Sequence, residues 1–188
     1  MKRRYLTKNE VQELINSANG FRHEVRDRCI LLMCYYHGFR VSELTGLKVS
    51  DINIPGKRIY IRRLKHGLST FHPLQMEEIV TLEKWIKKRV NYIKSDSEHL
   101  FLSQSGKKLS RQRVYMMIRE YALLAKFPFV THPHMLRHSC GFELAEQGLD
   151  TRLIQDYLGH RNIRHTVHYT ASNSGRFSRV WADTQIVA

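Results

Sequence analysis

The stretch from Glu24 to Leu47, EVRDRCILLMCYYHGFRVSELTGL, decides how this chain folds. Residues 24–37 are dense in large apolar side chains and predict a strongly buried helix. Gly38 ends this helix, because glycine readily adopts the left-handed conformation that follows many helices. Arg40 therefore lies just past a helix end, where the backbone turns and a side chain can be directed. A further short helix is predicted from Ser42 to Leu47.

Beyond residue 49 the spacing of apolar residues changes to a period of two. Isoleucines alternate with other residues over 52–61, on both sides of a Pro55-Gly56 turn, and predict a β-hairpin. Residues 69–72 can supply a third strand. Lys65 lies in the turn before that strand, at a tip from which a long flexible side chain can reach outward.

Helical patterns fill most of the rest of the chain. Thr7-Lys8-Asn9-Glu10 has the form of a capping box at the start of a helix. Ser110 and either Asp150 or Thr151 are expected to cap two later helices. The remaining helices are predicted at 75–94, 110–126, 134–148, 151–158, from 163 onward, and at 175–183. The expected fold is mainly α with a small antiparallel β-sheet, an α+β arrangement.

Composition limits the class of protein. The 188 residues suit one domain with a proper core, and 42% hydrophobic content favours a globular chain. Lysine and arginine number 31 against 17 acidic residues, giving a formal net charge of +14. Such an excess favours a polyanionic partner, since each phosphate neutralised releases condensed counterions.

Three cysteines, Cys29, Cys34 and Cys140, form no C-x-x-C pair and lie in apolar or helical stretches. They are typical of a reducing compartment and of packing roles. No apolar run follows the basic start of the chain, and no segment approaches the ~20 apolar residues of a membrane span. We therefore expect a soluble protein of the cytoplasm that associates with the nucleoid.

Six polar residues in one order carry the chemical signal: Arg40, Lys65, His134, Arg137, His160 and Tyr169. Two arginines can hold one phosphate through fork-shaped donor pairs, which lysine and histidine cannot reproduce. A tyrosine hydroxyl can act as a covalent nucleophile. Together these residue types predict a site that breaks and reseals a phosphodiester bond.

The local motifs around these residues resemble a known family. G-x-R-x-S-E-L at 38–44, H-x-x-R at 134–137 and L-G-H at 158–160 are similar to the catalytic domain of tyrosine site-specific recombinases, from about Tyr5 to Thr170. Residues 131–138 and 151–170 resemble the short fimbrial phase-switch invertases, the Fim and Mrp group. The resemblance implies a catalytic domain over 1–170, a tail over 171–188, and no separate N-terminal core-binding domain.

The resemblance implies a role for each residue. Arg40 and Arg137 would clamp the scissile phosphate, and Tyr169 would attack it to form a 3′-phosphotyrosine bond. Lys65 would protonate the departing 5′-oxygen. His134 and His160 would donate hydrogen bonds to the phosphate, with His134 also able to accept the tyrosine proton. Glu43 and His138 are expected to support these groups.

Some residues compete for these roles. Tyr157 rivals Tyr169 on position, although its apolar helical neighbours favour core packing. Lys57 is a weaker competitor of Lys65. His132, His134 and His138 have a spacing that zinc sites use, but their neighbours include Arg137, which would repel a cation. The resemblance implies no metal and no cofactor, because a phosphotyrosine conserves the bond energy for religation.

Further basic residues are candidates for DNA contact. Arg111, Arg113 and Arg119 fall on one predicted helix, whose solvated face is an equally good explanation for them. Arg161 and Arg164 precede the tyrosine and are expected on the phosphate side. The segment 171–188 carries large apolar residues: Phe177, Val180, Trp181, Ile186 and Val187. In the resembled family this segment docks on a neighbouring subunit of a tetramer; folding back on its own core is the alternative.

The function implied by the resemblance is DNA inversion. Short inverted repeats would be paired, cut one strand at a time and exchanged, with DNA-bending accessory proteins as possible partners. The expected consequence is inversion of a promoter element and phase variation of fimbriae. Two alternatives remain at this stage: a type IB topoisomerase-like nicking and closing enzyme, and a catalytically silent DNA-binding regulator.

Overall fold

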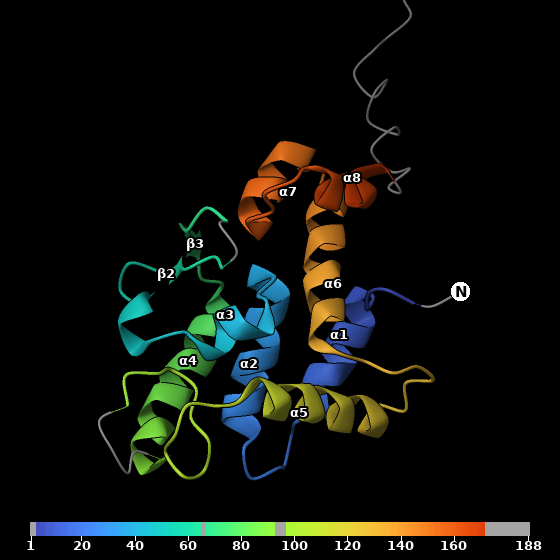
Figure 1. Ribbon diagram of the computed structural model, residues 1–188. Coiled ribbons are helices and arrows are strands. Elements are labelled where there is room, and N and C mark those ends of the chain that lie inside the picture. Colours follow the sequence, from blue (N-terminus) through green and yellow to red (C-terminus); the bar gives the residue numbers. More distant parts are fainter. Residues whose placement is uncertain (1–2, 65–66, 93–96, 172–188) are drawn as a thin grey trace, which may run out of the picture.

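The computed structural model describes residues 3–64, 67–92 and 97–171. At its centre stands α2 (Glu24–His37), of whose 14 residues ten are buried, so that almost every face of this helix contacts protein (Figure 1). It packs against α1 (Lys8–Asn16), α4 (Met76–Arg89) and α6 (Pro133–Glu146). Burying one large apolar side chain completely stabilises a fold by about 1.5–3 kcal/mol, so α2 anchors the main core.

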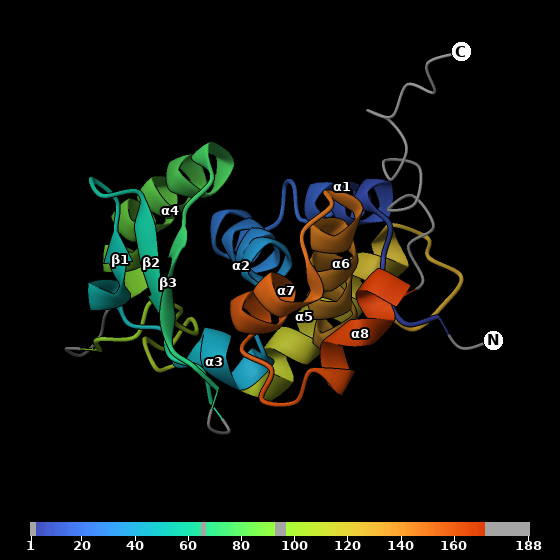
Figure 2. The same cartoon turned by 90° about the horizontal axis from the view of Figure 1, so that it is seen from above.

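A small antiparallel sheet lies beside this helical core, next to α4 (Figure 2). Its strands follow the order of the chain: β1 (Ile52–Asn53), β2 (Arg58–Ile61) and β3 (Thr70–Pro73). In the central strand Ile59 pairs with Ile52 on one side and with His72 on the other. The short helix α3 (Val41–Thr45) and a 3-10 turn at Val49–Asp51 connect α2 to the sheet.

The second half of the chain brings three helices together at one end of the molecule. α5 (Arg111–Leu124) contacts α1, α3 and α6. α7 (Thr151–Leu158) and α8 (Arg164–Ala171) pack on each other and on α6, at the top in Figure 1. A separate apolar cluster joins these three helices and includes Cys140, Ala145, Ile154, Leu158 and Tyr169.

The helical fold with its three-stranded sheet confirms the predicted fold class. Thr7 and Glu10 form the expected capping box at the start of α1. α2 has the predicted bounds, and Gly38, which was expected to end it, is left-handed with φ of 57°. Gly159 ends α7 in the same way, with φ of 64°. Local backbone chemistry therefore accounts for these boundaries.

The helices predicted over 110–126 and 134–148 end two residues early, at Leu124 and Glu146, and the helix predicted over 75–94 differs most. The helix expected over 75–94 is α-helical only as far as Arg89 and continues as a 3-10 turn at Val90–Tyr92. Valine and asparagine have lower helix propensity than the residues before them, which favours the tighter turn here. The short helix predicted at 175–183 lies outside the described residues. Within the described ranges, no helix has the length and apolar character needed to cross a membrane.

Candidate active site

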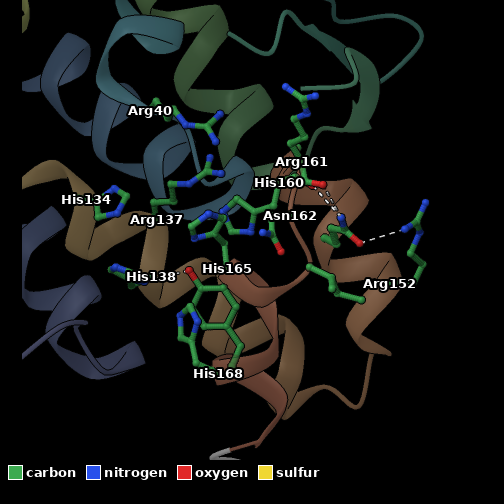
Figure 3. Close-up of a pocket in the computed structure, with 14 residues that line it drawn as sticks. Arg40, His134, Arg137, His138, Arg152, His160, Arg161, Asn162, His165 and His168 are labelled. Atoms are coloured by element: carbon green, nitrogen blue, oxygen red, sulfur yellow. Dashed lines mark hydrogen bonds between the residues drawn. The ribbon is translucent and has the colours of Figure 1, made fainter. Parts of the chain in front are cut away.

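A pocket of about 820 Å³ opens where α6, α7 and α8 meet the end of α2 (Figure 3). Four arginines and five histidines line it, and none of the described lining residues is a carboxylate. The lining residues are Arg40, His134, Arg137, His138, Arg152, Gln155, Gly159, His160, Arg161, Asn162, Ile163, His165, His168 and Tyr169. A pocket walled by cationic and imidazole groups is suited to an anion.

The turn after α2 places Arg40 at the pocket. A Cβ added to Gly38 would lie 2.5 Å from Leu158 Cδ2, so a glycine at this position lets α7 approach the end of α2. Arg40 is the N-cap of α3, and its Nη1 donates to Glu43 Oε1 at 2.7 Å. Glu43 Oε2 accepts from the Arg40 backbone N–H at 3.0 Å. Glu43 thus fixes both the backbone and the guanidinium of Arg40.

The second arginine, Arg137, is buried inside α6, with 1% of its surface exposed. Its guanidinium donates to the carbonyls of Gly38 and Leu158, and its Nη1 lies 4.0 Å from Glu43 Oε2. Burial and the nearby Arg40 charge lower its pKa to about 10, so it remains protonated at neutral pH. Two guanidinium groups therefore share the carboxylate of Glu43. Both also line the same pocket (Figure 3).

Two of the predicted catalytic residues that line the pocket, His134 and His160, are histidines. His160 follows the left-handed Gly159, and its Nδ1 lies 2.9 Å from the hydroxyl of the buried Thr166. Burial and the charges of Arg137 and Arg40 lower the pKa of His160 to about 3, so its ring is neutral at pH 7. His134 comes from the first turn of α6 and is more exposed; its pKa is lowered by partial burial and by Arg137.

Tyr169 is buried in α8, with 1% of its surface exposed. Its hydroxyl lies 2.9 Å from His138 Nδ1, and its ring stacks on His160 at a centroid distance of 6.4 Å. Gly141 makes room for this ring, since a Cβ there would lie 2.6 Å from Tyr169 Cζ. Burial raises the pKa of Tyr169 to about 12, although the Arg137 charge opposes the rise. The phenol is therefore protonated at pH 7.

The sequence predicts only a supporting role for His138, but in the structure its ring contacts the hydroxyl of Tyr169 directly. Burial and the neighbouring His134 lower its pKa to about 4, so the ring is neutral at pH 7. A neutral imidazole has one unprotonated nitrogen, and Nδ1 faces the phenol. The arrangement can accept the phenolic proton when Tyr169 attacks.

The structure brings five of the six predicted catalytic residues to one pocket, and Lys65 lies outside the described residues. Glu43 connects with two of the five, as described above, and its own pKa is affected in two ways. Burial raises the pKa of Glu43, but Arg63 and the hydrogen bonds from Arg40 lower it by more, so the carboxylate stays charged. The roles of these residues stay predictions.

The predicted DNA contacts divide into two groups. Arg161 lines the pocket, and Arg164 is exposed at the start of α8. Arg111, Arg113 and Arg119 lie on α5 outside the pocket; Arg113 pairs with Glu120 at 3.0 Å. The tail beyond Ala171 lies outside the described residues.

The competing residues have other surroundings. Tyr157 donates its hydroxyl to the Tyr36 carbonyl at 2.8 Å, and its ring lies 3.8 Å from that of His72, away from the pocket. Lys57 lies in the turn just before β2 and has a φ of 47°. Among the described residues, no three or more His, Cys, Asp or Glu side chains, His132, His134 and His138 included, form a group that could hold a metal ion.

Sequence reasoning missed several residues around the site. Arg152, His165 and His168 line the pocket, although no motif singles them out. Arg63 is wholly buried and pairs with Glu43 at 3.0 Å. Its signal was present in the period of two, which puts residue 63 on the same face as the buried Ile59 and Ile61.

The helical fold with its small sheet, and the pocket that holds two arginines and a buried tyrosine, agree with the arrangement expected of a tyrosine recombinase. The chain belongs to the phage integrase family, whose model matches residues 4–176. It is 53% identical over 180 residues to the type 1 fimbriae regulatory protein FimB of Escherichia coli K12, covering 96% of this chain and 90% of that protein. FimE of the same strain is 50% identical over 187 residues, covering 99% and 94%.

Solved structures agree with this assignment. The crystal structure of the XerA recombinase matches with a TM-score of 0.83 and 27% identity, covering 97% of this chain. This chain spans 65% of that XerA chain. The XerH site-specific recombinase bound to its difH substrate matches with a TM-score of 0.80 at 23% identity, which supports the fold. The protein is thus a tyrosine recombinase by family, sequence and fold.

Proposed function

We propose that this protein inverts a DNA segment bounded by short inverted repeats, cutting and rejoining each strand through a phosphotyrosine on Tyr169. The observation that carries the proposal is the single pocket that holds Arg40, Arg137 and the Tyr169 hydroxyl partner His138. The 50% and 53% identity to two type 1 fimbriae regulatory proteins supports a promoter element of a fimbrial operon as the inverted segment.

The chemistry follows from the groups present. Arg40 and Arg137 hold the non-bridging oxygens of the scissile phosphate and stabilise the charge that builds up there. The Tyr169 oxygen forms a bond to phosphorus as the bond from phosphorus to the 5′-oxygen breaks. His138 accepts the phenolic proton, in place of His134, because its Nδ1 already contacts the hydroxyl. Lys65 supplies the proton taken by the leaving 5′-oxygen.

Religation reverses these steps on the partner strand. The 5′-hydroxyl of another strand attacks the phosphotyrosine, and the phenol regains its proton. The number of phosphodiester bonds is unchanged, so no external energy source enters the scheme. Inversion requires two sites, and we propose a tetramer on paired repeats, assisted by DNA-bending proteins, acting on the chromosome in the cytoplasm. In this scheme residues 1–170 form the catalytic domain, and the tail 171–188 is the segment that docks between subunits.

A nicked suicide duplex tests the nucleophile. It carries the inverted repeat found beside the gene, with a nick just 3′ of the cut so that the short 5′-hydroxyl fragment diffuses away. The wild-type protein should form a covalent adduct in the presence of EDTA. Tyr169→Phe should bind the same duplex and form no adduct, while the matched control Tyr157→Phe should still form it. An adduct in Tyr169→Phe would refute the assignment.

A plasmid assay tests inversion. The wild-type protein should invert the segment between two head-to-head repeats and leave a plasmid without repeats supercoiled. Relaxation of the plasmid that lacks repeats, with no inversion of the other, would indicate a nicking and closing enzyme instead.

A further inference from the structure

Arg63 is a buried arginine that pairs with Glu43 next to the pocket, and no sequence motif identifies it. Its side chain has 0% exposure, and its Nη1 donates to Glu43 Oε2 at 3.0 Å. Its Nη2 donates to the His37 carbonyl at 3.0 Å and to the Tyr157 carbonyl. One guanidinium thus joins the end of α2, the end of α7 and the carboxylate that holds Arg40.

Residues on both sides of Lys65 in the sequence contact the ion pair formed by Arg63 and Glu43. On one side, the Leu64 backbone N–H donates to Glu43 Oε1 at 3.1 Å. On the other side, Gly67 lies against the Arg63 stem, since a Cβ added there would be 2.8 Å from Arg63 Cβ. The Arg63 backbone N–H also donates to the Ser69 hydroxyl at 3.2 Å.

The same stem supports the segment that precedes His160. A Cβ added to Gly159 would lie 2.6 Å from Arg63 Cγ, so this residue packs directly on the arginine. A Cβ added to Gly67 would lie 2.8 Å from the Gly159 carbonyl oxygen. Two glycines therefore enclose the stem of Arg63, one from each segment, and a larger side chain at either position would push the segments apart.

We propose that Arg63 is a positioning residue for strand cleavage: together with Glu43 it holds Leu64 in place and keeps Gly67 next to Gly159. Proton donation to the leaving 5′-oxygen by Lys65, which lies between Leu64 and Gly67 in the sequence, then depends on Arg63. The inference rests on the proposed function. Arg63 does not line the pocket, so it acts through the groups it holds. A positional error of about 1 Å in such a group can lower a rate by about 10²-fold.

A change of leaving group separates this role from a merely structural one. In a duplex whose bridging 5′-oxygen at the cut is replaced by sulfur, the leaving thiolate has a conjugate-acid pKa of about 8.5, far below that of an alcohol, and needs no proton donor. Arg63→Lys keeps the positive charge but lacks the two forked guanidinium nitrogens that donate to Glu43 and to the His37 and Tyr157 carbonyls. It should cut the oxygen duplex about 10²-fold more slowly than wild type and regain at least about tenfold on the sulfur duplex.

Gly67→Ala provides a second test that leaves the buried ion pair intact. Its added methyl group should push residue 67 away from Arg63, slow cleavage of the oxygen duplex, and give the same recovery of the cleavage rate on the sulfur duplex. Arg62→Gln is the matched control, because it removes an arginine charge one residue away whose side chain is 50% exposed and pairs with Asp51. It should cut both duplexes like wild type. DNA binding and the thermal midpoint are measured for every variant.

The outcomes are distinct. Equal loss on both duplexes in Arg63→Lys and Gly67→Ala, or no loss in either, would overturn the positioning role. Lys65→Ala tests the proposed function separately, since it should also recover on the sulfur duplex. If Lys65→Ala does not recover, Lys65 is not the proton donor, and the role of Arg63 is still decided by its own two variants.

Discussion

Replacing Glu43 by glutamine should strongly destabilise the protein, because it removes the one carboxylate that three guanidinium groups share. Glu43 is 4% exposed and lies 2.7 Å from Arg40, 3.0 Å from Arg63 and 4.0 Å from Arg137. Glutamine keeps the shape and one acceptor oxygen but leaves buried positive charge uncompensated. Breaking a buried ion pair in this way costs about 3–5 kcal/mol.

The partial exposure of Arg40, 26% at its side chain, places the expected loss at the lower end, about 3 kcal/mol. For a domain of this size each 1 kcal/mol lowers the thermal midpoint by about 2–4 °C, so Glu43→Gln should melt about 6–12 °C below wild type. Circular dichroism melting at pH 7 measures this. Sulfate should restore the variant more than wild type, since an anion bound between Arg40 and Arg137 supplies the missing negative charge.

Asp51→Asn is the matched control for this comparison. Asp51 is also a buried carboxylate, but its guanidinium partner Arg62 is 50% exposed, so its loss should cost only about 1 kcal/mol and show no special response to sulfate. A Glu43→Gln midpoint within about 2 °C of wild type, or a sulfate response equal to that of Asp51→Asn, would refute the shared-carboxylate argument.

Three further predictions concern the histidines and the tyrosine. The folded-state pKa values of His138 (about 4) and His160 (about 3) lie below the ~6.5 of an unfolded histidine, so the unfolded chain binds more protons and stability falls as the pH drops from 7 to 5. Fully buried, each would contribute up to ~1.9 kcal/mol to this loss; allowing for partial exposure, the pair should contribute about 2 kcal/mol to the total loss that urea unfolding measures, and His160→Gln should lose less than wild type. An unchanged loss in His160→Gln would contradict the assignment. His138→Gln should cut DNA about 10²-fold or more slowly at pH 7, with the deficit shrinking toward pH 9, because the small phenolate fraction of Tyr169 rises about tenfold per pH unit; a deficit independent of pH would contradict proton acceptance by His138. Gly141→Ala places a methyl group 2.6 Å from the Tyr169 ring and should abolish cleavage while DNA binding persists; normal cleavage would mean that the ring moves freely.

The sequence predicted those parts of the fold that depend on neighbours in the chain. Thr7 and Glu10 cap a helix within one turn, and Gly38 ends α2 through its own backbone conformation, so local patterns suffice. α4 ends at Arg89, earlier than the predicted residue 94, because the switch to a 3-10 turn has no strong sequence marker. Helix ends without a glycine or proline are therefore the less predictable ones.

The site was predicted through motifs, and its connections were not. Arg40 and Arg137 are identified by their local sequence motifs, but those motifs do not indicate that both side chains approach Glu43. The contact between His138 and Tyr169 spans 31 residues, and that from Arg63 to Tyr157 spans 94. Contacts between residues so far apart are set by how helices and strands pack, which a residue pattern does not encode.

Mapping the covalent linkage tests the central claim most directly. Trypsin should release Tyr169 in the peptide 165–176 and Tyr157 in the peptide 153–161, so mass spectrometry of the digested protein–DNA adduct distinguishes them. The account predicts a nucleotide remnant on Tyr169 through its 3′-phosphate. A remnant on Tyr157 or on any other residue would contradict it.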